Sequence, residues 1–147
     1  MSAQIVQIEK DIEVLCVTVS SFPDGVQNAF DGLSSKIPST EGRTLYGISY
    51  GTEDGSIIYK AAITQVESDE AEKYQCETFL IRKGSYISET ITDFMKNIPE
   101  IGQTFRKLFA DPRVDKTSGY CVERYLNQKD VQCLVTLATV ETADVTA

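Results

Sequence analysis

The second half of this chain repeats the first in outline, and this internal duplication constrains the fold more than any single motif. Phe30 and Leu33 recur 75 positions later as Phe105 and Leu108, and both segments have helical spacing. The apolar positions of two strand-like segments recur 74 positions later: Tyr46, Ile48, Tyr59, Ala61 and Ile63 correspond to Tyr120, Val122, Cys133, Val135 and Leu137. Each half therefore reads as strand, helix, strand, strand. Two such halves packed together leave a cleft between them, and clefts at module interfaces favour ligands.

The 147 residues fit one compact domain built from two modules. We expect the single domain to cover residues 1–147, with a first module at about 8–67 and a second at about 74–140. Residues 67–73 are acidic and lack large apolar groups up to position 72, so they predict an exposed connection. The small, polar tail at 141–147 is expected to fray.

In the first half, residues 12–19 are rich in β-branched and apolar types and predict a strand. Val26, Phe30, Leu33 and Ile37 follow at steps of 4, 3 and 4, which is an amphipathic helix stripe. Residues 45–51 and 56–66 predict a hairpin around an Asp-Gly turn.

In the second half, residues 75–82 and 86–88 predict extended segments, and a helical stripe begins near position 92. Pro99 lies inside that stripe, so we expect a kink or a new helix there, with Asn97 or Ile98 at the cap position. Residues 119–126 and 131–140 predict a second hairpin. These elements indicate an α+β fold with two pseudo-symmetric βαββ modules, a largely antiparallel sheet, two main helices and a central ligand cleft.

Composition excludes several function classes. The chain has no histidine, so it has no Ser–His–Asp triad, Cys–His dyad or histidine-ligated metal. Its four cysteines form no C-x-x-C pair and are expected to be free thiols, and no nucleotide-binding loop is visible, so we expect neither cofactor nor metal. The net charge of −8 disfavours direct nucleic-acid binding. No apolar run reaches membrane length and no secretory signal is visible, so we expect no membrane association and a cytoplasmic location.

Glu123 is the leading candidate for a functional side chain. Strand alternation places it on one face with Cys121 and Tyr125, while Tyr120, Val122 and Arg124 lie on the other. The duplicate strand has Gly47, Ser49 and Gly51 on the face that matches Glu123. We expect the large apolar face to lie under the helices, and the other face to offer room and a charge. A cationic ligand would compensate a carboxylate in a partly dry pocket, although a solvent-facing glutamate fits the same pattern.

Tyrosines are the candidate walls of such a pocket. Tyr59 lies on the first hairpin and Tyr86 in the second half, and a phenol offers an apolar body with a polar tip. Tyr125 is the best of the set because it shares a predicted face with Glu123. Ser49 and Cys121 complete the expected ligand-binding residues.

The order of these features resembles the GyrI-like effector-binding domains over roughly residues 8–140. The resemblance rests on Phe22-Pro23 before a helix, Gly42-Arg43, Tyr46-Gly47, the Asp-Gly hairpin leading to Tyr59, Gly84-x-Tyr86 and Glu123-x-Tyr125. It implies two βαββ modules about a pseudo-two-fold axis with a ligand cleft between them. In that family a glutamate of the penultimate strand meets cationic ligands, and its match here is Glu123.

Three functions remain open at this point. The leading hypothesis is a stand-alone binding protein for lipophilic, cationic small molecules, anchored by Glu123. Some members of the family resemble hydrolases of small electrophilic compounds, which implies a catalytic role for Glu123 and Tyr125 as an alternative, and nothing in the sequence itself favours catalysis over binding. Others resemble topoisomerase inhibitors, which implies a protein-interaction module, with a transcription regulator or another protein as partner.

Overall fold

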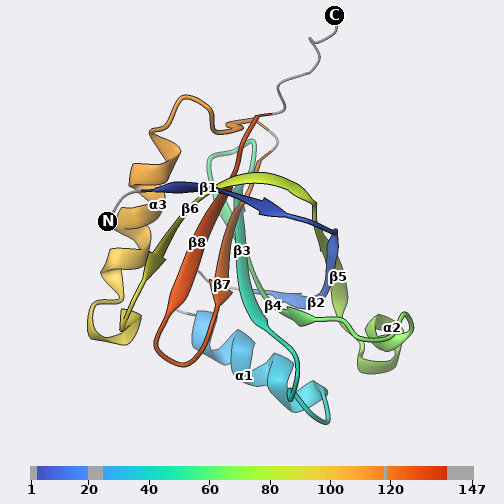
Figure 1. The fold of residues 1–147 in the computed structure, drawn as a ribbon. Helices are drawn as coiled ribbons and strands as arrows, with labels where there is room; N and C mark the ends of the chain where they lie inside the picture. Colours follow the sequence, from blue (N-terminus) through green and yellow to red (C-terminus); the bar gives the residue numbers. More distant parts are fainter. Residues whose placement is uncertain (1–2, 20–24, 118, 139–147) are drawn as a thin grey trace, which may run out of the picture.

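The computed structural model describes residues 3–19, 25–117 and 119–138. Eight antiparallel strands form one curled sheet, in the order β1-β6-β8-β7-β3-β4-β2-β5 (Figure 1). The strands are β1 (Gln4–Ile8), β2 (Ile12–Thr18), β3 (Leu45–Gly51), β4 (Ile57–Thr64), β5 (Glu77–Ile81), β6 (Gly84–Ile91), β7 (Cys121–Tyr125) and β8 (Val131–Thr136). The helices are α1 (Val26–Lys36), α2 (Glu70–Tyr74) and α3 (Pro99–Phe109), with a short 3₁₀ turn, η1 (Phe94–Lys96). None of the described helices is long and apolar enough to span a membrane.

The order of the strands is that of two βαββ modules facing each other. β6, β8 and β7 belong to one module and β3, β4 and β2 to the other, and the modules meet where β3 pairs with β7. In that ladder Ile48 lies opposite Val122, its own counterpart 74 positions along the chain. The pseudo-two-fold axis therefore passes through this pair. The α+β fold with two pseudo-symmetric modules is confirmed.

Each module exchanges one strand with the other. β1 precedes β2 in the chain but pairs with β6, whereas β5 precedes β6 but pairs with β2. β1 and β5 also share the same burial pattern, in which only the last residue, Ile8 or Ile81, is buried. The sequence analysis did not predict β1, which buries only Ile8, as a strand, so the repeat is one strand longer than expected.

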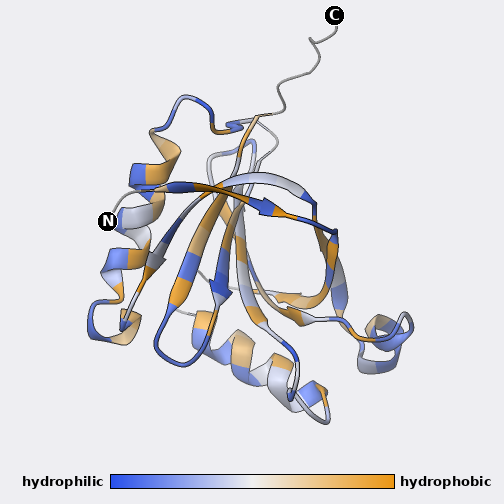
Figure 2. Ribbon diagram, in the orientation of Figure 1, coloured by the Kyte–Doolittle hydropathy of each residue, from blue (hydrophilic) through white to orange (hydrophobic). Residues whose placement is uncertain are grey.

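Both large helices cover the outer face of the sheet. α1 packs on β2 and β4, and α3 packs on β6 and β8 (Figure 1). Figure 2 shows apolar and polar residues alternating along strands and around helices, as the predicted stripes require. The predicted start of a new helix at Pro99 is confirmed. The 3₁₀ turn η1 ends before Pro99, and α3 begins at Pro99 with Ile98 at the N-cap.

The predicted assignment of the two sheet faces is wrong. The face with Tyr120 and Val122 does not lie under the helices but on the inside of the curl, in one cluster with Ile8 of β1 and Ile81 of β5. The helices cover the Glu123 face instead, where Leu108 of α3 packs near Cys121 and Tyr125. Alternation separates two faces but does not say which is concave. Because residues of both edge strands reach the central strands on that side, the large side chains fill the concave face.

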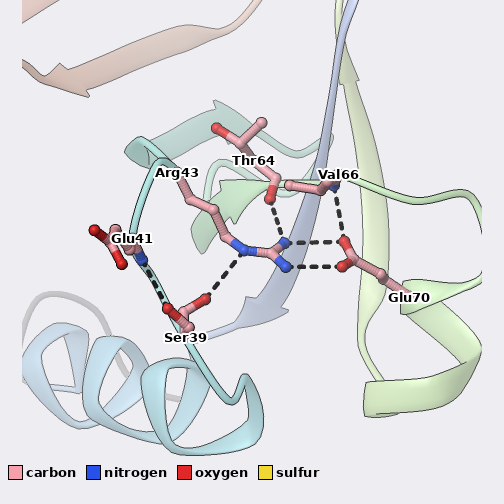
Figure 3. Close-up of polar contacts among 6 residues, drawn as sticks. All are labelled: Ser39, Glu41, Arg43, Thr64, Val66 and Glu70. Carbon is pink, nitrogen blue, oxygen red and sulfur yellow. Dashed lines mark hydrogen bonds and ion pairs between the residues drawn. The ribbon is translucent and has the colours of Figure 1, made fainter.

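The acidic stretch at 67–73 is more than an exposed connection. It runs into α2, whose first residue, Glu70, is only 4% exposed. Arg43 holds both oxygens of Glu70: Nη1 donates to Oε1 at 2.9 Å and Nη2 to Oε2 at 2.7 Å (Figure 3). The backbone NH of Val66 donates to Oε1 as well, and Arg43 also donates to the carbonyls of Thr64 and Ser39. The expectation of exposure therefore fails at Glu70, since a paired and hydrogen-bonded charge tolerates burial.

The Arg43–Glu70 pair predicts a specific loss of stability in acid. The hydrogen bond from Arg43 lowers the pKa of Glu70 to about 2. Its contribution is thus complete above the ordinary pKa of the unfolded chain and disappears as the pH falls toward 2. Glu70→Gln should reduce the free energy of unfolding at neutral pH by roughly 2–3 kcal/mol, and by less in acid.

Urea unfolding at several pH values measures this difference. The matched control is Glu72→Gln, which removes an exposed carboxylate from the same helix and should change little. Equal stability of the wild type and Glu70→Gln at neutral pH would contradict the role given to this pair.

Candidate functional site

A cleft of about 890 Å³ opens on the outer face of the sheet, beside the junction of the two modules. The strands β3, β4 and β7 supply its floor, α3 and the preceding Ile98 supply one wall, and Val26 contributes from the start of α1. The lining residues are Val26, Ser49, Ile57, Tyr59, Ile98, Ile101, Gly102, Phe105, Arg106, Phe109, Ala110, Cys121, Glu123 and Tyr125. Apolar and aromatic residues make up most of this set, as in small-molecule sites of this volume.

Glu123 reaches the floor of the cleft because Gly47 makes room for it. The two residues lie opposite each other in the β3–β7 ladder. A Cβ atom at position 47 would overlap the hydroxyl of Tyr59 and lie 2.6 Å from Oε1 of Glu123. The absence of a side chain at Gly47 therefore lets the carboxylate and the Tyr59 phenol meet above the backbone.

Two phenols hold the carboxylate of Glu123. The hydroxyl of Tyr59 on β4 donates to Oε1 at 2.7 Å, and the hydroxyl of Tyr125 on β7 donates to the same atom at 2.6 Å. No hydrogen bond from the described part of the chain reaches the other oxygen, Oε2. Both donors come from rigid strands, so the position of the carboxylate is fixed before any ligand arrives.

Among the described residues, the carboxylate has no cationic partner. Within residues 3–19, 25–117 and 119–138, no Lys or Arg forms an ion pair with Glu123. Burial raises the pKa of Glu123, and the hydrogen bonds from Tyr125 and Tyr59 oppose that rise. Burial also raises the pKa of both phenols, so they remain protonated donors. An acid in this position is destabilised when charged, and a cation in the cleft would relieve that cost.

Aromatic rings fix the position of Tyr125. Its ring meets Phe30 of α1 edge-on, with centroids 6.0 Å apart, and Phe94 of η1 with centroids 5.5 Å apart. Phe30 belongs to the first module and Phe94 to the second. Tyr125 is thus clamped between the two halves, and the electron-rich faces of such rings suit a cationic neighbour.

Ser49 and Cys121 form a neutral part of the floor. They face each other in the β3–β7 ladder, next to the Gly47–Glu123 pair. Burial raises the pKa of the Cys121 thiol to about 12, so it remains a thiol rather than a thiolate. All four cysteines are free, as the sequence analysis expected. Glu123 is therefore the one acid and Arg106 the one base among the described lining residues.

Tyr86 lies away from this cleft. Its side chain is on the concave face, only 2% of the residue is exposed, and its hydroxyl donates to the carbonyl of Arg82 at 2.7 Å. It also lies 2.8 Å from the hydroxyl of Tyr120. Tyr86 borders a separate hollow of about 650 Å³. The structure thus brings together Glu123, Tyr125, Tyr59, Ser49 and Cys121 from the expected set, but not Tyr86.

The sequence analysis missed the wall that α3 provides. Ile101 and Phe105 lie on the helical stripe that was predicted to begin near position 92, yet they line the cleft together with Ile98, which is 52% exposed. Phe109 continues the stripe four residues beyond Phe105, and Ile57 begins β4. The signal available in the sequence was an apolar stripe on this helix that extends beyond the residues needed to cover the sheet. The described residues contain no group of three or more acids or cysteines placed to hold a metal ion.

Comparison with known proteins identifies the fold but no family. No protein-family model and no curated protein sequence matches this chain. An integron cassette protein from the mobile metagenome of Vibrio cholerae has a similar structure, with a TM-score of 0.68 and 15% identity over 92% of this chain and 95% of that protein.

Two further solved structures share the fold. SAV2435, solved bound to tetraphenylphosphonium, has a TM-score of 0.59 and 13% identity over 92% of this chain and 94% of its own. A Staphylococcus aureus MU50 protein whose description is that of a bacterial transcription regulation protein has a TM-score of 0.54 and 12% identity, over 92% and 99%. At these identities the likeness extends to the fold alone.

The close approach at Gly47 predicts a position-specific effect of one methyl group. Gly47→Ala should push Tyr59 or Glu123 out of place and lower the free energy of unfolding by about 1–3 kcal/mol. Gly51→Ala on the same strand is the matched control, since the nearest atom to its added Cβ is 3.9 Å away. Urea unfolding of both variants measures the difference, and equal stabilities would contradict the tight contact.

The raised pKa of Glu123 predicts that the wild type loses stability as the pH rises. The folded state holds the Glu123 proton more tightly than the unfolded chain does, so this group favours folding in acid and disfavours it once ionised. Glu123→Gln should therefore be more stable than the wild type near neutral pH, by about 0.5–2 kcal/mol. The advantage should shrink as the pH falls from the raised pKa of Glu123 to the ordinary glutamate range, and it should be absent below that range. Thermal unfolding across pH tests this. A variant that is less stable at every pH would refute the unfavourable burial of the charge.

Proposed function

We propose that this protein binds lipophilic cations in the cleft, with Glu123 as the counter-charge. The observation that carries the proposal is a partly buried carboxylate, held by two phenols and lacking a cationic partner among the described residues, on the floor of an apolar cleft. Such an arrangement is unfavourable in the free protein and is relieved by a ligand that brings a positive charge together with apolar surface.

The cleft suits the apolar part of such a ligand. Ile101, Phe105 and Phe109 on α3 face the strand residues across the cleft and offer apolar contact area. The rings of Tyr59 and Tyr125 stand beside the carboxylate, where each contributes cation–π attraction of roughly 0.5–2 kcal/mol. Apolar burial supplies affinity, and the carboxylate selects for positive charge.

The comparisons support the same class of ligand. SAV2435 shares the fold and was solved with a lipophilic cation, tetraphenylphosphonium, bound to it. The GyrI-like resemblance of the sequence adds the expectation that a glutamate of the penultimate strand meets cations. β7, which carries Glu123, is the penultimate strand of the described part of the chain. Together these points support a GyrI-like ligand-binding role for this domain.

One observation also favours a second candidate, hydrolysis of small electrophiles. A glutamate whose pKa is raised by burial is a better general base than an exposed one, and the Tyr125 hydroxyl lies 2.6 Å from it. Turnover of an electrophilic cyclopropanoid compound by the wild type, with none by Glu123→Gln, would favour this activity. Binding without product formation would leave the protein a binding module.

Titration with tetraphenylphosphonium tests the binding proposal. The wild type should bind it, and Glu123→Gln should weaken binding by about 2 kcal/mol or more, roughly 30-fold, since the amide keeps the shape but loses the charge. Calorimetry or quenching of tyrosine fluorescence measures both constants.

The matched control is Glu100→Gln, which removes one acid from α3 without touching the lining of the cleft. It should bind tetraphenylphosphonium nearly as the wild type does. If Glu123→Gln and the wild type bind with equal affinity, Glu123 is not the anchor and the proposal fails.

A further inference from the structure

The hydrogen bonds at Glu123 are unevenly divided between its two oxygens. Tyr59 and Tyr125 both donate to Oε1, while Oε2 receives no hydrogen bond from any described residue. Glu123 itself lines the cleft and keeps part of its surface exposed. The side chain therefore presents one oxygen fixed by the protein and one left for whatever enters the cleft.

This geometry is compatible with both protonation states of the carboxyl group. When the group is ionised, Oε1 accepts from both phenols and Oε2 is an acceptor or a counter-charge for a cation. When it is protonated on Oε2, Oε1 becomes the carbonyl oxygen, which still accepts from both phenols through its two lone pairs. Oε2–H then becomes a donor. Neither state requires Tyr59 or Tyr125 to move.

Among the groups in direct contact with the site, Glu123 is the one whose protonation state is expected to change. The titratable groups that face it are neutral near pH 7: Tyr59 on β4, Cys121 and Tyr125 on β7, and Cys133 on β8, each with a pKa raised chiefly by burial. β3 contributes only Gly47 and Ser49 at this point. The charged groups nearby are Arg106 and Glu100 on α3, and Glu89 on β6, which is paired with Lys107. None of them forms an ion pair with Glu123.

We propose that the cleft binds two classes of lipophilic ligand, selected by the proton on Glu123: cations when the carboxyl group is ionised, and neutral molecules with a strong hydrogen-bond acceptor when it is protonated. A phosphine oxide or an amide carbonyl is such an acceptor. This inference rests on the proposed function and extends its ligand class.

Each ligand class supplies the partner that one protonation state of Glu123 lacks. A cation compensates the charge of the ionised group, for which the described residues supply no counter-ion. A neutral acceptor takes the Oε2–H bond, and a buried donor without a partner is costly. The apolar wall formed by Ile101, Phe105 and Phe109 serves both classes alike.

Two probes of similar shape separate the classes: tetraphenylphosphonium, a cation, and triphenylphosphine oxide, a neutral acceptor. The affinity for tetraphenylphosphonium should fall by up to tenfold for each pH unit below the pKa of Glu123 in the free protein, and level off above it. The affinity for triphenylphosphine oxide should do the reverse, level in acid and falling by up to tenfold for each pH unit above that pKa. The two curves should bend at the same pH.

Glu123→Gln sharpens the test because its amide resembles the protonated acid in charge and in having a donor. It should bind triphenylphosphine oxide at every pH with no bend, and bind tetraphenylphosphonium weakly throughout. Glu100→Gln, the charge-matched control, should keep both bends. Circular dichroism establishes that each variant is folded under the conditions used.

The outcomes separate this inference from the proposed function. If tetraphenylphosphonium binding depends on Glu123 while triphenylphosphine oxide fails to bind, or binds with no dependence on pH, the inference is wrong and the proposed function stands. If neither probe binds the wild type, the proposed function fails and the inference fails with it. Opposite slopes that disappear together in Glu123→Gln are the result expected.

Discussion

The site depends on one cross-strand pair, Gly47 opposite Glu123. At this position the chain supplies a carboxylate on one strand and no side chain on the other, so that a phenol from a third strand reaches over the backbone. The cost of the buried charge is offset by two hydrogen bonds but by no ion pair among the described residues. That unbalanced charge gives an otherwise apolar cleft its preference for a ligand.

The duplication explains where this pair lies, and its breakdown explains why there is a single site. Glu123 corresponds to Ser49 in the first module, and its partner Tyr59 corresponds to Cys133 in the second. The pseudo-two-fold axis passes between the two modules, at the Ile48–Val122 pair. A symmetric protein would carry the carboxylate and its phenol twice or not at all. The two modules differ at these positions, so Glu123 is the one acid among the described lining residues of the cleft, and the proposed binding follows from that asymmetry.

Much of the fold could be predicted from the sequence because pattern and spacing are local properties. The hairpins, both long helices and the restart at Pro99 follow from periodicity and proline geometry, and the repeat gave the modular order. Periodicity did not reveal β1, which buries little, or the concave side of the sheet, which depends on how distant strands curl together. Glu70 was expected to be exposed because it lies in an acidic stretch without large apolar groups, and its distant partner in the chain, Arg43, was not recognised. At the site, alternation correctly grouped Glu123, Tyr125 and Cys121 on one face of the sheet with Ser49, although it placed the helices over the opposite face. Tyr86 lies on the opposite face of the sheet. Alternation within β6 does not show which of its faces continues the Glu123 face of β7, because the two strands are not neighbours in the sheet.

The most direct test of this account is the ionisation of Glu123 itself, followed through its side-chain carboxyl carbon by NMR with and without tetraphenylphosphonium. In the free protein the carboxyl group should titrate above the ordinary glutamate range, because burial opposes its charge. With the cation bound, its pKa should fall, because the ligand stabilises the ionised form. A carboxyl group that titrates as an exposed glutamate does, and that does not respond to the ligand, would contradict the central claim that an unpaired buried charge makes this cleft a cation site.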